Sequence, residues 1–141
     1  MASVLVVDRN PVVRMVIQRT LAGEGFVVRE ATSCHTDVLP LGLAPDVVLV
    51  EVETPEAHHL DPLRRLRARY PDVPVIACAN RAGPSSADDA ALRSGAFALL
   101  RKPVQLEALV ETVHGALGLD PFARPPLSIE PRSVLGAAPP A

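Results

Sequence analysis

The chain has 141 residues, with 16 acidic and 14 basic side chains, and this length predicts one ordinary domain with a sizeable core. The near-neutral charge and the few aromatic residues argue against nucleic-acid binding. The first apolar stretch is too short and has the wrong flanks for a signal peptide, and the sequence has no apolar run of membrane-spanning length and no CxxC pair. We therefore expect a cytoplasmic protein with two free cysteines and no membrane partner.

Short apolar runs alternate with segments of helical spacing along the first 118 residues. In chain order the sequence predicts strand 4–7, a helix from Pro11 that Gly23 to Gly25 end, strand 26–28, a weak helix at 32–43, strand 47–50, helix 62–70, strand 75–79, a helix from Ser85 or Ser86 to Leu92, strand 97–100 and helix 104–117. Asn10 is the expected cap of the first helix. Residues 119–141 are rich in proline and lack periodicity, which predicts a flexible tail after a domain at 1–118.

The strands are continuously apolar rather than alternating, which is typical of a parallel sheet covered by helices on both faces. In such sheets the ligands gather at the carboxyl ends of the strands. The residues at those ends form the candidate site: Asp8, Arg9, Glu51, Ala79, Asn80, Arg101 and Lys102.

The ordered set of short motifs resembles one family. The motifs are Val4-Leu5-Val6-Val7-Asp8, Pro45-Asp46 leading to Glu51 with Pro55 beyond it, Pro74-Val75-Ile76, Gly95-Ala96 and Lys102-Pro103. Over residues 3–118 they are similar to the CheY-like receiver domain of two-component response regulators. The resemblance implies an α/β, flavodoxin-like (βα)5 three-layer sandwich, with five parallel strands in the order 2-1-3-4-5.

The resemblance also implies a phosphorylation site. In the family, paired acids bind Mg²⁺, an aspartate after the third strand accepts a phosphoryl group from a histidine kinase, a threonine or serine and an aromatic residue relay the change, and a lysine contacts the phosphoryl group. Asp8 and Lys102 match, and Lys102 is the only lysine beside 13 arginines. Glu51 stands at the acceptor position. Arg9 replaces the second acid, and Ala79 and Leu99 stand at the switch positions.

These replacements disfavour the usual chemistry. The extra methylene of Glu51 displaces its carboxylate by up to about 1.5 Å, and a misplacement of about 1 Å can reduce a rate roughly a hundredfold. Arg9 offers no lone pair and repels Mg²⁺. We therefore expect no cofactor and no catalytic residue; Mg²⁺, if bound, would use Asp8, Glu51 and Glu53.

Two readings of the altered site remain open. Asp8, Arg9, Glu51 and Lys102 could form a closed cluster of four charges in which the cationic arms replace Mg²⁺, and a glutamate at the acceptor position sometimes acts like a phosphorylated aspartate in this family. Alternatively, Asp8 and Lys102 are an ion pair that persists only for structural reasons.

Other polar groups favour ordinary structural roles. His58, His59 and Asp61 lack further ligands at metal-binding spacing. The basic residues of helix 62–70 predict a solvated face. Cys78 is expected to be an inert core thiol, and Cys34 is placed in the weak second-helix region.

The sequence predicts a stand-alone, atypical receiver that is not an enzyme and acts as a protein-interaction module without aspartyl phosphorylation. Its partner would be a histidine kinase or another signalling protein, or a second copy bound through the family's fourth helix, fifth strand and fifth helix, where Leu92, Leu99 and Arg101 lie. The alternatives are a receiver that a histidine kinase still phosphorylates and, from another class, a flavodoxin-like cofactor-binding or enzyme domain; the latter lacks a glycine-rich phosphate loop.

Overall fold

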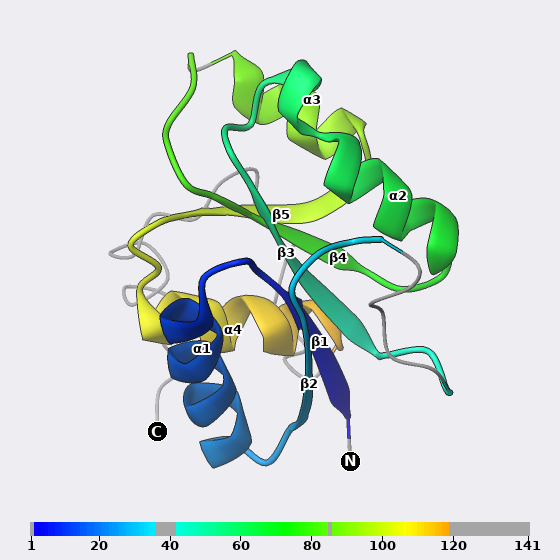
Figure 1. Ribbon diagram of the computed structural model, residues 1–141, viewed down its shortest axis with the longest axis vertical. Helices are drawn as coiled ribbons and strands as arrows, with labels where there is room; N and C mark the ends of the chain where they lie inside the picture. The colour runs from blue at the N-terminus through cyan, green and yellow to red at the C-terminus, as the bar shows by residue number, and fades with distance from the viewer. Residues whose placement is uncertain (1, 36–41, 85, 119–141) are drawn as a thin grey trace.

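The computed structural model describes residues 2–35, 42–84 and 86–118, which contain one parallel sheet of five strands (Figure 1). The strands lie in the order β2-β1-β3-β4-β5, which confirms the predicted topology. Their bounds are β1 Ser3–Val7, β2 Val27–Ala31, β3 Val47–Val52, β4 Val75–Ala79 and β5 Ala96–Arg101. Because all neighbouring strands are parallel, their carboxyl ends meet at one edge of the sheet.

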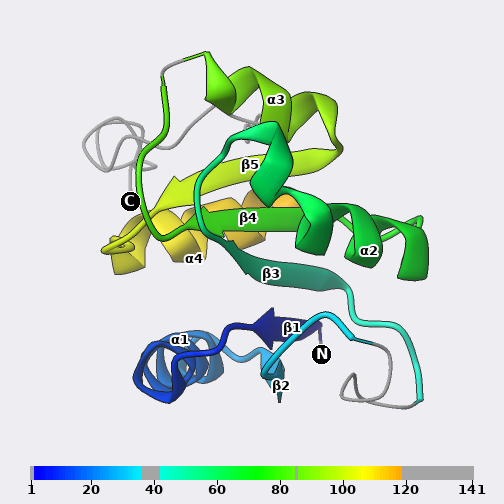
Figure 2. The same cartoon turned by 45° about the horizontal axis from the view of Figure 1, so that its top comes forward.

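Helices cover both faces of the sheet and make three layers (Figures 1 and 2). Their bounds are α1 Pro11–Gly23, the 3-10 helix η2 Ala57–His59, α2 Asp61–Arg69, α3 Ala87–Arg93 and α4 Leu106–Ala116. The α1 and α4 helices pack on one face, and α2 and α3 pack on the other. Within the described ranges, no helix is long and apolar enough to cross a membrane.

The alternation of side chains along each strand divides the core into two clusters. In β1, Val4 and Val6 pack with α1 and α4, whereas Leu5 and Val7 pack with α2 and α3. A strand covered on both faces has no polar side to expose, so its sequence is apolar at every position.

The predicted first helix begins as expected, since the side chain of Asn10 accepts hydrogen bonds from the N–H groups of residues 12 and 13 at 2.9 and 3.3 Å.

Several element bounds differ from the sequence prediction. The second strand runs over Val27–Ala31 rather than 26–28, because its pairing with β1 extends the ladder to Ala31. The third strand continues to Val52, so Glu51 lies inside the strand rather than after it. Of the predicted helix at 32–43, residues 36–41 lie outside the described residues, and the described residues at its two ends are not helical. The predicted tail at 119–141 also lies outside them.

The turn between α3 and β5 depends on Gly95, whose φ is +105°. A Cβ built on Gly95 would lie 2.8 Å from Nε of Arg67, and the Arg67 guanidinium is itself fixed by donating to the carbonyl of Val73 at 3.2 Å. We expect Gly95→Ala to lower the free energy of unfolding by about 1–3 kcal/mol, because alanine resists this backbone angle and crowds Arg67. Urea denaturation with a fluorescent or circular dichroism signal measures the loss.

Gly23→Ala is the matched control for that prediction. Gly23 ends α1 with no heavy atom within 4 Å of an added Cβ and without a positive φ. Its replacement should leave stability unchanged or raise it by up to about 1 kcal/mol, since alanine restricts the unfolded chain. Equal effects of the two substitutions would contradict the role assigned to the Gly95 turn.

Candidate functional site

Four strands bring polar side chains to the carboxyl edge of the sheet. Asp8 follows β1, Glu51 lies near the end of β3, Asn80 follows β4, and Lys102 follows β5. The predicted site residues Asp8, Arg9, Glu51 and Lys102 lie together there, and we call these four side chains the charge network.

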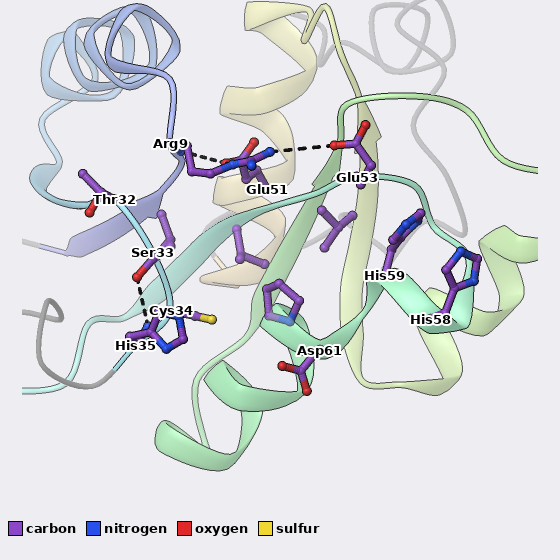
Figure 3. Close-up of a pocket in the computed structure, with 14 residues that line it drawn as sticks. Arg9, Thr32, Ser33, Cys34, His35, Glu51, Glu53, His58, His59 and Asp61 are labelled. Atoms are coloured by element: carbon purple, nitrogen blue, oxygen red, sulfur yellow. Dashed lines mark hydrogen bonds and ion pairs between the residues drawn. The ribbon is translucent and has the colours of Figure 1, made fainter.

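Arg9 binds the side chain at the acceptor position. Its backbone N–H and its Nε both donate to Oε1 of Glu51, at 2.7 and 2.8 Å. The Arg9 side chain is 73% exposed, whereas that of Glu51 is 12% exposed. The guanidinium therefore lies over the carboxylate from the solvent side (Figure 3).

Lys102 lies between the carboxylates of Asp8 and Glu51. Its Nζ lies 2.7 Å from Oδ2 of Asp8 and 3.6 Å from Oε2 of Glu51. Asp8 is 3% exposed, and its other oxygen accepts the backbone N–H of Asn10 at 2.8 Å. The network therefore holds two acids and two cations, so its formal charges cancel.

Asn80, one of the predicted site residues, and Arg81, which the sequence analysis did not single out, extend this arrangement. The Asn80 amide donates to Oε2 of Glu51 at 3.1 Å and to Oε2 of Glu53 at 3.2 Å, and Arg81 Nε lies 2.8 Å from Oε1 of Glu53. The available signal was the position of both residues directly after β4, where side chains point toward the site. Asn80 thus joins the acceptor-position glutamate to a second acid, Glu53, which directly follows β3.

The carboxylate oxygens of the candidate Mg²⁺ ligands have hydrogen-bond and ion-pair partners within the chain. Lys102, Arg9, Arg81, the Asn80 amide and the Asn10 backbone already occupy the oxygens of all three candidate ligands, Asp8, Glu51 and Glu53. Magnesium needs near-octahedral oxygen ligands that are free to coordinate it. A Mg²⁺ ion at this site would have to displace these partners. Among the described residues, no group of three or more His, Cys, Asp or Glu side chains is arranged to hold a metal ion.

The positions of the family's switch residues hold small or buried side chains. Ala79 and Leu99 are both 0% exposed, and both belong to the core cluster beneath α2 and α3. The prediction of Leu99 as a surface contact is wrong, because the alternation along β5 turns its side chain into this core. Leu92 is partly buried against the same cluster. Arg101 is bound to Asp88 of α3, and its Nε is buried without a hydrogen-bond partner.

A cleft of about 510 Å³ lies beside the charge network, between the segment after β2 and the start of α2 (Figure 3). Arg9, Glu51 and Glu53 line one side of it, and His58 and His59 line another. His59 is held by a 2.8 Å hydrogen bond between its Nδ1 and Thr54 Oγ1. The centroids of the His58 and His59 imidazole rings lie 4.0 Å apart.

Two arginines of α2 have local partners, and both cysteines are free thiols. In α2, Arg65 pairs with Asp61 at 2.7 Å and Arg69 lies over the Tyr70 ring. Cys78 is buried as predicted, and burial raises the pKa of its thiol to about 12. Cys34 is partly exposed, and burial raises the pKa of this thiol too. Neither thiol is poised for nucleophilic chemistry at neutral pH.

The charge network keeps Glu51 ionised. Burial acts to raise the pKa of its carboxyl, but the hydrogen bonds from Arg9 and Asn80 and the charge of Lys102 together hold that pKa below its usual value of 4.5. The same pairing raises the pKa of Arg9 through its hydrogen bond to Glu51. Glu53 also has a lowered pKa, caused first by the hydrogen bond from Asn80.

The lowered pKa of Glu51 predicts a pH dependence of stability. A group whose pKa is depressed by folding stabilises the fold above its unfolded pKa, and this contribution is lost as the pH falls through the folded value. We expect the free energy of unfolding, measured with urea, to fall below about pH 4.5. Glu51→Gln should lose less stability over that range than the parent.

Glu24→Gln is the control for the pH prediction. Glu24 is exposed at the end of α1, and within the described residues its side chain forms no hydrogen bond or ion pair. Its removal should leave the acid-induced loss unchanged. A Glu51→Gln profile parallel to that of the parent would contradict the role of Glu51 in the charge network.

Comparisons with known proteins agree with this architecture. The chain is 32% identical to protein-glutamate methylesterase/protein-glutamine glutaminase 1 of Anaeromyxobacter dehalogenans, over 96% of this chain and 44% of that protein. It is 34% identical to the response regulator GacA of Pseudomonas aeruginosa, over 81% of this chain and 54% of that protein. The chain therefore spans about half the length of these relatives.

Solved structures share the fold. The chemotaxis protein CheY4 of Vibrio cholerae superposes with a TM-score of 0.67 at 22% identity, covering 83% of this chain and 99% of that one. A response regulator from Thermotoga maritima gives a TM-score of 0.68 at 22% identity, covering 84% and 98%. The sequence model described as the response regulator receiver domain matches residues 4–114. The chain therefore belongs to the response regulator receiver domain family.

Proposed function

We propose that this receiver domain works as a protein-interaction module in two-component signalling without aspartyl phosphorylation. The observation that carries the proposal is the double hydrogen bond from Arg9 to Glu51, which places a permanent cation on the only carboxylate at the acceptor position. With Lys102 on the other side, both oxygens of Glu51 face cations or amides of the chain itself. The domain then signals through what it binds, with a histidine kinase or another signalling protein as the partner.

The charge network replaces the charges of a loaded phosphorylation site with charges of the chain. A metal and a phosphoryl group would have to displace Arg9 from Glu51 and Lys102 from Asp8 at the same time. Loss of three hydrogen bonds to carboxylates, two from Arg9 and one from Lys102, together with exposure of the almost fully buried Asp8, makes this exchange unfavourable. The absence of a hydroxyl at Ala79 removes a donor for the phosphoryl oxygens as well.

Incubation with acetyl phosphate and Mg²⁺ tests the proposal directly. In a competent receiver, a carboxylate oxygen attacks phosphorus, the bond from phosphorus to the acetyl oxygen breaks, and acetate leaves. We expect no mass increase of the intact chain and no Mg²⁺-dependent NMR shift at Glu51 or at its neighbours. A Mg²⁺-dependent phosphoryl adduct on Glu51 or Asp8 would instead support conventional phosphorylation by a kinase.

A matched variant separates the effect of Arg9 from a general effect of charge. Arg9→Ala removes the guanidinium from Oε1 of Glu51 and keeps only the backbone hydrogen bond, whereas Arg93→Ala removes an exposed arginine of α3 that has no partner among the described residues. If Arg9 excludes Mg²⁺, the affinity for Mg²⁺ measured by isothermal titration should rise in the first variant only. Tight Mg²⁺ binding by the parent chain would refute the proposed exclusion.

A further inference from the structure

The outer surface of α1 and α4 carries an apolar patch that the fold leaves uncovered. Four of the six large hydrophobic side chains that are exposed in the described part of the chain lie there: Val12 at 60%, Met15 at 42%, Val16 at 40% and Leu106 at 42%. We call these four residues the α1–α4 patch. Isolated exposed apolar residues are common, but a group of them on one surface marks an interaction site.

Helical spacing shows that the patch is separate from the core. Ile17 and Leu21 are the buried residues of α1, one turn apart on its inner side. Val12, Met15 and Val16 are spaced i, i+3 and i+4, so they form a stripe on the opposite side of the same helix. The helix therefore has two apolar sides, and the sheet covers only one of them.

Leu106 belongs to the same surface because α1 and α4 share a face of the sheet. Ile17 and Leu21 of α1 pack in one core cluster with Leu109 and Val113 of α4. A cleft of about 550 Å³ is lined by Pro11 and Val13 of α1 and by Lys102, which precedes α4. Because α1 follows β1 and α4 follows β5, both helices begin next to the carboxyl edge of the sheet, and Val12 and Leu106 lie in their first turns.

Two unpaired charges of opposite sign border the patch. Arg19 lies three residues beyond Val16 on the exposed stripe of α1, and Glu107 follows Leu106 in the first turn of α4; both are exposed. Neither forms a hydrogen bond or ion pair with any described residue. Because Arg19 is the ninth residue of its helix and Glu107 the second of its own, the two lie at different depths, by about 10 Å along the helix axes.

A surface with an apolar centre, a cation toward one end and an anion toward the other is complementary to itself. Under a two-fold axis, residue i contacts residue j and j contacts i, so one rotation would pair both charges at once. We propose that the α1–α4 patch is a dimer interface that binds a second copy of this chain, with Arg19 facing Glu107 of the partner subunit. A partner with a uniformly acidic or basic surface would satisfy only one of the two charges.

Sedimentation velocity of the full chain over a wide range of concentrations tests this interface. We expect a monomer–dimer equilibrium that Val16→Glu abolishes. Arg19→Glu and Glu107→Arg should each raise the dissociation constant about tenfold, since each reversal sets like charges opposite one another twice. The double variant Arg19→Glu/Glu107→Arg should return to within about threefold of the parent, because it restores both pairs in reverse.

Control variants distinguish the interface from a loss of folding. Val27→Glu changes an exposed valine of β2, and Arg93→Glu reverses an exposed charge on α3, which lies on the opposite face of the sheet; neither should change the equilibrium. Urea unfolding must show that Val16→Glu remains folded. A monomer at every concentration, or a dimer insensitive to Val16→Glu and to both reversals, would overturn the proposal. So would a monomeric chain whose patch serves to bind a different protein.

Discussion

Replacing Lys102 by methionine is expected to lower the free energy of unfolding by about 3 kcal/mol or more at neutral pH. The substitution preserves the length and apolar character of the lysine stem but removes the only cation that, among the described residues, lies within hydrogen-bond distance of the Asp8 carboxylate, at 2.7 Å. Asp8 is 3% exposed and keeps one hydrogen bond, from the Asn10 backbone, so its charge would remain buried and largely uncompensated. Chemical denaturation by urea gives the value.

Substitution of Asp8, alone and together with Lys102, measures how strongly these two side chains depend on each other. Asp8→Asn should be milder than Lys102→Met, because Lys102 still has Glu51 at 3.6 Å and 16% of its own side chain in contact with water. The double variant Asp8→Asn/Lys102→Met should be more stable than the sum of the single losses predicts, since the buried charge and its partner are removed together. Additive losses, or a Lys102→Met variant within about 0.5 kcal/mol of the parent, would show that the two side chains do not depend on each other.

The contacts that depend only on charge and on the order of the strands could be predicted from the sequence. Asp8 and Lys102 follow the first and fifth strands, and parallel topology brings both ends to one edge, so their meeting could be predicted. The pairing of Arg9 with Glu51 followed from opposite charges at neighbouring strand ends. Neither inference required knowledge of side-chain conformations.

The hydrogen bonds of Asn80 to Glu51 and Glu53 were not predicted, because they depend on strand register and strand length. A run of apolar residues reveals neither. The β3 strand continues to Val52, and Val52 pairs with Ala79 in the neighbouring strand, so Asn80 comes next to both Glu51 and Glu53. A strand ending before Glu51 would not have placed the amide there. The Leu99 error has a similar origin, since the two-residue period of β5 sets which face Leu99 occupies.

Restoring the family's usual residues is expected to restore phosphorylation. Arg9→Asp replaces the covering guanidinium by a second acid, Glu51→Asp withdraws the carboxylate by up to about 1.5 Å, and Ala79→Thr supplies a hydroxyl. We expect the triple variant to gain a Mg²⁺-dependent adduct from acetyl phosphate, detected as a phosphoryl mass increase on the intact chain, whereas the parent gains none.

The single variants show which change limits the chemistry. Each leaves at least one defect, and catalytic groups that act as a unit lose activity together rather than additively. Arg9→Asp alone should therefore bind Mg²⁺ more tightly without forming much adduct, because the longer Glu51 remains misplaced. Glu51→Asp alone should form little adduct, because Arg9 still carries the positive charge that repels the metal.

The results for the parent chain and the triple variant show whether Arg9, Glu51 and Ala79 alone prevent phosphorylation. A fully folded triple variant that binds Mg²⁺ but takes up no phosphoryl group would mean that Arg9, Glu51 and Ala79 are not the residues that limit the chemistry. Phosphorylation of the parent chain on Glu51 would mean that the phosphoryl group can displace the Arg9 side chain from Glu51. Full recovery in the triple variant alone would show that the chain retains the geometry of a receiver and that Arg9, Glu51 and Ala79 suffice to silence it.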